Sequence, residues 1–192
     1  LDLIDQLHQE AKDNKISDET RDKLISETLN LVNDSSFINN LNNIKAKDKL
    51  IQQVKASDVL NDTTKATLIN NILDNDATSA EFDNKHNQIT QLYVDAEELT
   101  KAKNDLVDLT KSKKFEKLSK DKQDAINKAI ANSDEILNNL NSYRNEDVVK
   151  QTIIDKKLKQ ASPILIWPYF VAASFVSWLI GMLIFVFGRK KK

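Results

Sequence analysis

The chain has 192 residues, of which 28 are Lys or Arg and 29 are Asp or Glu, so its net charge is close to zero. It contains no cysteine, which excludes disulfides, thiolate metal sites and thiol chemistry. The charges of both signs are well mixed and form no basic face able to neutralise phosphates, so we expect no nucleic-acid partner.

Glycine and proline are absent from residues 1–162, and all copies of both lie at residues 163–192. Tight turns and most hairpins depend on these two residue types. The composition therefore predicts an all-α chain whose turns are made by Asn, Asp and Ser. The chain begins at Leu1 and carries no basic-then-apolar leader. We therefore expect it to be the C-terminal part of a longer, exported protein.

Four ordinary helices are predicted in residues 1–75, because apolar residues recur there at spacings of three and four. Ser17, followed by two acidic residues, is the expected N-cap of the second, Ser35 or Ser36 of the third, and Asn61 or Asp62 of the fourth. The apolar faces comprise Leu3, Ile4, Leu7 and Ala11; Leu24, Ile25, Leu29 and Val32; Phe37, Leu41, Ile44, Leu50, Ile51 and Val54; and Leu68, Ile69, Ile72 and Leu73.

The longest predicted helix covers residues 79–112, where apolar positions keep a near-heptad spacing. Those positions are Phe82, Ile89, Leu92, Tyr93, Ala96, Leu99, Ala102, Leu106 and Leu109. A further helix is expected from Ser119 to Leu140, and residues 146–160 form a last helical stretch. The similar starts at Ser17, Asn61 and Ser119 indicate either an internal repeat or a chance likeness among capped helices.

Residues 164–187 contain no charged side chain, and as a helix they would extend roughly 36 Å. The hydrocarbon core of a bilayer is about 30 Å thick. The sequence therefore predicts one transmembrane helix, with the lipid bilayer as a partner. The expected anchor residues are the interfacial aromatics and the terminal cations: Trp167, Tyr169, Arg189, Lys190, Lys191 and Lys192.

Orientation follows from the four consecutive cations at the C-terminus, which directly abut the apolar segment. They place residues 188–192 in the cytoplasm as a basic tail and residues 1–162 outside the cell. The predicted localisation is a single-pass cell-membrane protein.

No constellation of catalytic or metal-binding residues is visible. His8 and His86 are far apart in sequence, and we expect His86 to be packed or half-exposed near Phe82. The acidic pairs Glu97-Glu98 and Asp134-Glu135 are expected on solvated faces, without the burial or close partner that shifts a catalytic pKa. We therefore expect no enzyme activity, no cofactor, no metal and no small-molecule substrate.

Capped helices rich in Asn and Lys, followed by a hydrophobic segment and Arg-Lys-Lys-Lys, resemble the C-terminal region of the giant staphylococcal extracellular-matrix-binding proteins. That family is built from helical FIVAR and GA modules, and residues 93–99 through 124–130 look most like such a module. The tail also resembles a cell-wall sorting signal. Ala161, Ser162 and Pro163 stand where Leu-Pro-x-Thr-Gly would precede the apolar segment, which favours retention in the membrane.

The expected architecture is two elongated three-helix bundles in tandem that share one long central helix. The predicted divisions are a module at 1–75; a module at 79–142 that shares helix 79–112; a juxtamembrane linker at 143–163; the transmembrane helix at 164–187; and the tail at 188–192.

The resemblance implies a membrane-anchored stalk of a cell-surface fibre involved in adhesion and envelope integrity. One alternative is a module that binds a host matrix or plasma protein such as fibronectin or albumin. Another is an intracellular, tail-anchored coiled-coil protein.

Overall fold

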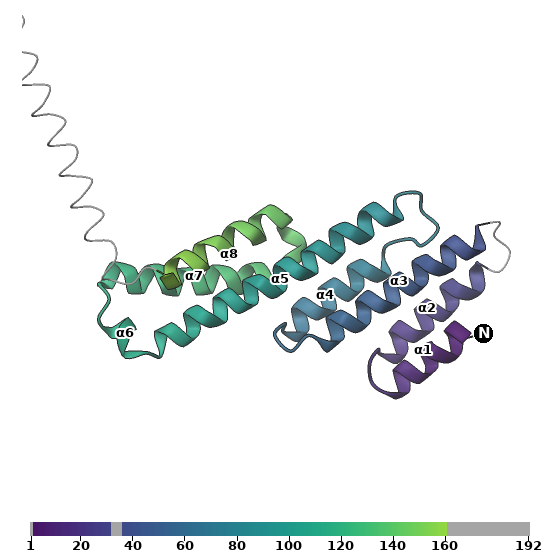
Figure 1. Cartoon of the computed structure of the whole chain (residues 1–192), viewed down its shortest axis with the longest axis horizontal. Coiled ribbons are helices and arrows are strands. Elements are labelled where there is room, and N and C mark those ends of the chain that lie inside the picture. Colours follow the sequence, from purple (N-terminus) through teal and green to yellow (C-terminus); the bar gives the residue numbers. More distant parts are fainter. Residues whose placement is uncertain (1, 32–35, 161–192) are drawn as a thin grey trace, which may run out of the picture.

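The computed structural model describes residues 2–31 and 36–160 (Figure 1). Within these residues the fold is all-α, and no strand is present. Its elements are α1 (Asp2–Lys12), α2 (Asp18–Asn30), α3 (Phe37–Ala56), α4 (Asp62–Leu73), α5 (Phe82–Thr110), α6 (Lys113–Glu116), α7 (Lys120–Asn138), the 3-10 helix η1 (Leu140–Ser142) and α8 (Asn145–Gln160).

Turns without glycine are made by small polar residues, as the composition predicts. Asn14, between α1 and α2, takes a left-handed φ of 57°, a conformation that asparagine tolerates better than most residues. Ser17 caps α2 by accepting the amide of Thr20 at 3.1 Å. Asn61 caps α4 by accepting the amide of Thr64 at 2.8 Å. Both caps satisfy amides that the first turn of a helix leaves free.

The long helix predicted at residues 79–112 is α5, an uninterrupted helix of 29 residues. Every apolar position of its predicted stripe is buried or half-buried. Its first part packs against α3 and α4, and it also packs against α6, α7 and α8 (Figure 1). Because Phe82 and Leu99 lie in one buried cluster and Leu106 in another, α5 contributes to both apolar cores of the described chain.

The region that the sequence assigns to a juxtamembrane linker contains a packed helix. α8 lies against both α5 and α7 (Figure 1), and α5 makes its most extensive helix contact with it. The buried face of α8 is largely polar, because Gln151, Thr152 and Asp155 point inward beside Val148. Residues 145–160 therefore belong with α6, α7 and the second half of α5, here called the second group of helices. The first group is α1 to α4 with the first part of α5.

A further contact joins the two groups away from α5. The end of α7 and η1 pack against α4. The hydroxyl of Thr64 donates to the buried carbonyl of Leu137 at 2.8 Å, and the amide of Asn71 donates to the side-chain oxygen of Asn141 at 2.8 Å. Leu140 is 1% exposed and belongs to the larger apolar core. The groups therefore meet at two places, through α5 and through this α4–α7 contact.

The predicted single-pass membrane localisation is corrected by the structure, which does not support it. Among residues 2–31 and 36–160, no helix is both long enough and apolar enough to cross a membrane. α5 has the length, but charged residues such as Asp83, Asp95 and Asp105 recur along it. Residues 164–187, on which the prediction was based, lie outside the described residues.

Candidate functional site: a buried polar network at the start of α5

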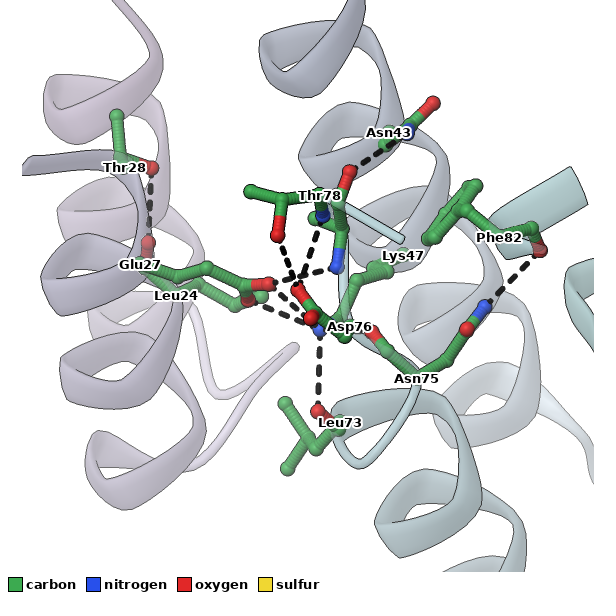
Figure 2. A network of polar contacts seen from close by, with 11 residues as sticks. Leu24, Glu27, Thr28, Asn43, Lys47, Leu73, Asn75, Asp76, Thr78 and Phe82 are labelled. Atoms are coloured by element: carbon green, nitrogen blue, oxygen red, sulfur yellow. Dashed lines mark hydrogen bonds and ion pairs between the residues drawn. The ribbon is translucent and has the colours of Figure 1, made fainter. Parts of the chain in front are cut away.

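An extensively bonded polar group surrounds Lys47 on α3 (Figure 2). Lys47 is 0% exposed, which is rare for a lysine because a buried ammonium must replace its lost hydration. Its neighbours come from α2 and from the connection between α4 and α5. The network therefore lies where the long helix leaves the first group.

Four oxygens surround the Lys47 ammonium. The two carboxylate oxygens of Glu27, on α2, lie 3.1 and 2.9 Å from Nζ. The backbone carbonyls of Leu73 and Asn75 accept at 3.1 and 2.9 Å. The Leu73 carbonyl belongs to the last turn of α4, where carbonyls lack partners within the helix and carry partial negative charge. Lys47 therefore caps the end of α4 from the side.

The same connection is held at three further points. Glu27 Oε1 accepts the amide of Ala77 at 3.3 Å, and the amide of Asn43 donates to the Ala77 carbonyl at 2.7 Å. The Asn75 side chain donates to the Phe82 carbonyl at 3.2 Å, in the first turn of α5. Figure 2 shows these groups converging on the strip of backbone between α4 and α5. The network thus fixes both ends of that strip.

Asp76 adds two hydrogen bonds within the same connection between α4 and α5. Its Oδ1 accepts both the backbone amide and the hydroxyl of Thr78 at 2.9 Å. The hydrogen bond from the Thr78 amide is the main reason that the pKa of Asp76 lies below its ordinary value, because it stabilises the ionised carboxylate. Asp76 is thus held as a charged turn residue.

The chemistry of this site suits it to holding the surrounding helices in position. An ammonium that donates to a carboxylate and to two carbonyls has no lone pair for nucleophilic attack. Glu27 is one-quarter exposed, so water reaches one side of the pair while the lysine stays dry. The arrangement can hold α2, α3, α4 and the start of α5 in one geometry.

A groove of about 760 Å³ lies beside this network, between α2 and α4. It is lined by Glu19, Asp22, Lys23, Ser26, Glu27, Asn30 and Leu73. It is open to solvent, whereas sites that hold small molecules are usually concave and mostly apolar. We therefore assign it no ligand.

A second buried carboxyl lies in the other group of helices. Asp155 on α8 is 0% exposed. It accepts the Ser133 hydroxyl of α7 at 2.7 Å and the Gln151 amide at 2.8 Å. Burial raises the pKa of Asp155, while these two bonds and the charge of Lys103 act against the rise. This cluster fastens α8 to α7.

The two histidines singled out from the sequence lie on α1 and α5. His8 is exposed on α1, and His86 stacks on Phe82 with ring centroids 5.3 Å apart, as expected. Within the described ranges, no group of three or more His, Cys, Asp or Glu residues could hold a metal ion. The six predicted anchor residues, Trp167, Tyr169, Arg189, Lys190, Lys191 and Lys192, lie outside the described residues.

One member of each acidic pair is less solvated than the sequence suggests, whereas Glu98 and Glu135 are exposed as expected. Glu97 is half-buried and accepts the hydroxyls of Ser57 at 2.7 Å and Tyr93 at 3.1 Å. Asp134 forms an ion pair with Lys103 at 2.7 Å. These carboxylates serve as contacts between helices.

Sequence reasoning missed Lys47 because it treated charged residues as solvated by default. A usable signal was present, however. Lys47 follows Ile44 by three residues and precedes Ile51 by four, so it is in phase with the apolar stripe of α3. Glu10 has the same relation to Leu7 on α1.

Comparison with known proteins identifies no relative: no family model, no curated protein and no solved structure matches this chain. The resemblance to the staphylococcal matrix-binding family therefore stays a prediction.

Proposed function

We propose that this chain is a stiff helical spacer in a bacterial cell-surface fibre, in the form of two helical bundles that share α5. The observation that carries the proposal is the double connection between the groups. α5 contributes to both apolar cores, and the end of α7 with η1 also packs against α4. To bend between the groups, the chain would have to break α5 and separate the α4–α7 contact at the same time.

The buried network around Lys47 supports the same role. A spacer transmits direction only if its long helix leaves the preceding bundle at a fixed angle. The connection between α4 and α5 is the natural place for a hinge, and Lys47, Glu27 and Asn75 hold it with bonds to side chains and backbone. The surface-fibre setting itself rests on the resemblance of the Asn- and Lys-rich capped helices to the matrix-binding family.

Stiffness can be measured directly because the chain has no cysteine of its own. Spin labels on Asp22→Cys in α2 and Asp121→Cys in α7 would report the distance between the groups by double electron–electron resonance. A matched pair, Asp22→Cys with Asp62→Cys, lies within the first group. We expect a distance distribution as narrow for the first pair as for the second. A much broader distribution across the groups would contradict the spacer.

The cellular setting needs its own measurement. In intact bacteria that express the full parent protein, a membrane-impermeant amine reagent should label lysines of residues 1–160. Labelling only after lysis would remove the surface-fibre part of the proposal and leave the stiffness result untouched.

A second candidate function is binding of a host protein such as fibronectin or albumin. It is favoured by α8, whose apolar residues Val149, Ile153 and Ile154 are 40–47% exposed, whereas three of its polar residues, Gln151, Thr152 and Asp155, point inward. Replacing these three by Ser should abolish binding of the chain to immobilised fibronectin or albumin, whereas replacing the exposed Val94 should not. If the wild-type chain binds neither protein, this candidate fails for both.

A further inference from the structure

A second pair of buried charged residues joins α1 to α3. Glu10, in the last turns of α1, is 5% exposed, and Asp48, in the middle of α3, is 2% exposed. A side-chain hydrogen bond and the charge of Glu10 both act on the Asp48 carboxyl, so the two groups are neighbours. Two acidic groups placed together in a low-dielectric interior repel each other when both are ionised, so this arrangement needs an explanation.

The surroundings of the two carboxyls are symmetrical. The amide of Gln6 donates to Glu10 Oε1 at 2.8 Å, and the amide of Gln52 donates to Asp48 Oδ2 at 2.9 Å. Each glutamine lies four residues from its acid on the same helix. The two remaining oxygens, Glu10 Oε2 and Asp48 Oδ1, are buried and receive no donor from any described residue. One unsatisfied oxygen of each acid is thus left at the contact between the helices.

A single proton accounts for both unsatisfied oxygens. A protonated carboxyl carries one O–H donor, so a proton on either acid makes a hydrogen bond to the other. A bond between an O–H and a carboxylate is among the stronger protein hydrogen bonds. The pair would then hold one negative charge instead of two, with all four oxygens bonded.

We propose that Glu10 and Asp48 share one proton that latches α1 onto α3, and that loss of this proton releases α1. The latch closes in acid and opens in base. The other buried side chains of α1 are Leu3 and Leu7, so release would expose an apolar face. This device is independent of the spacer function, because α5 and the α4–α7 contact do not involve α1.

The charges around Asp48 agree with a proton held in the neutral range. Burial, followed by the hydrogen bond and charge of Glu10, raises the pKa of Asp48 to about 7, and the bond from Gln52 acts in the opposite direction. Glu10 is the charged group that acts on Asp48 from a packed helix. Lys47, the next residue on α3, is bonded to Glu27 of α2 and to the carbonyls of Leu73 and Asn75.

The direction of the pH effect follows from the sign of this shift. The folded pKa lies above the ordinary value of 3.8, so the folded state binds the proton more tightly than the unfolded chain does. Stabilisation by this pair is complete below about pH 4 and is lost as the pH rises through about 7.

Amide hydrogen exchange on the full chain at pH 6 and pH 8.5 tests the latch, with rates corrected for intrinsic exchange. Above the pKa, one released proton changes the opening equilibrium about tenfold per pH unit. We therefore expect protection of α1 to fall by at least tenfold between these pH values while α5 stays protected. Unchanged protection of α1 would overturn the proposal.

The matched variants are Asp48→Asn and Asp5→Asn. An asparagine at position 48 donates an N–H where the shared proton would be, so α1 should stay protected at both pH values. Asp5 is exposed on α1, so the Asp5→Asn variant should keep the wild-type response to pH. A fall that persists in Asp48→Asn would contradict the shared proton.

Two further measurements cover failure of that variant and a different occupant. If Asp48→Asn does not fold, Glu10→Gln makes the same replacement from α1, and a carboxyl ¹³C titration of the wild type reports the pair directly. A titration near pH 7 supports the latch, and two ordinary carboxyl values near pH 4 refute it. Loss of α1 protection at pH 6 on addition of EDTA would assign the two oxygens to a cation and reject the shared proton.

Discussion

Replacing Lys47 by methionine tests how much the buried network contributes to stability. Methionine keeps most of the length of the side chain and removes the charge. The change leaves the Leu73 and Asn75 carbonyls without the ammonium that now lies 3.1 and 2.9 Å away, and it leaves Glu27 with only the weaker bond from Ala77. Removal of one partner of a buried ion pair costs about 3–5 kcal/mol. Because Glu27 is one-quarter exposed and stays partly solvated, we expect a loss of about 3 kcal/mol.

Urea denaturation followed by circular dichroism measures this loss. Lys23→Met is the matched control, because Lys23 forms an exposed ion pair with Glu19 at 3.2 Å. Exposed pairs of this kind contribute about 0–1 kcal/mol. The double variant Lys47→Met with Glu27→Leu should recover part of the loss, since no unpaired carboxylate remains. If Lys47→Met destabilises the chain no more than Lys23→Met, the network does not hold the joint.

Two smaller predictions concern helix caps and the second buried acid. Ser17→Ala and Asn61→Ala should each lower stability by about 1 kcal/mol in thermal melts, whereas Ser119→Ala, whose side chain makes no capping bond, should lower it less. Burial raises the pKa of Asp155, so its contribution to stability is lost as the pH rises above the ordinary value of 3.8. Asp155→Asn should therefore reduce the fall in stability above pH 4; an unchanged profile would contradict this.

Helix content and the long helix were predictable from composition and spacing. Without Gly or Pro before residue 163, nothing interrupts the stripe from Phe82 to Leu109, and the observed helix ends within three residues of the prediction. Asn and Ser at the turns behave as expected, because their side chains accept the amides that each new helix leaves free. These features depend on local geometry, which the sequence specifies directly.

The packing of α8 was not predictable in the same way. Apolar spacing in residues 146–160 emphasises Val149 and Ile153, which the structure leaves exposed. The inward face is made by Gln151 and Asp155, each satisfied by a partner on α7. A polar face can be buried only when its partners come from elsewhere in the chain, and hydrophobic periodicity does not include that information. The buried Lys47 escaped prediction for a different reason: it is in phase with the apolar stripe of α3, but charged residues were taken to be solvated.

Because the helix groups are connected both through α5 and through the α4–α7 contact, a prediction follows that neither connection alone would give. Lys101 is exposed in the second half of α5, so Lys101→Pro breaks the helix, at about 3 kcal/mol or more, without opening a cavity. If the end of α7 and η1 still hold α4, the distance between labels on α2 and α7 should stay narrow in this variant. Leu140→Ala weakens the α4–α7 contact from its buried centre and should also leave the distribution narrow.

Combining the two changes should broaden the distribution far beyond the effect of either, because only then is the chain free to bend between the groups. Lys101→Ala with Leu140→Ala is the control, since it keeps α5 continuous. A broad distribution in Lys101→Pro alone would mean that α5 carries all of the stiffness, and a narrow one in the combined variant would mean that other contacts hold the groups together.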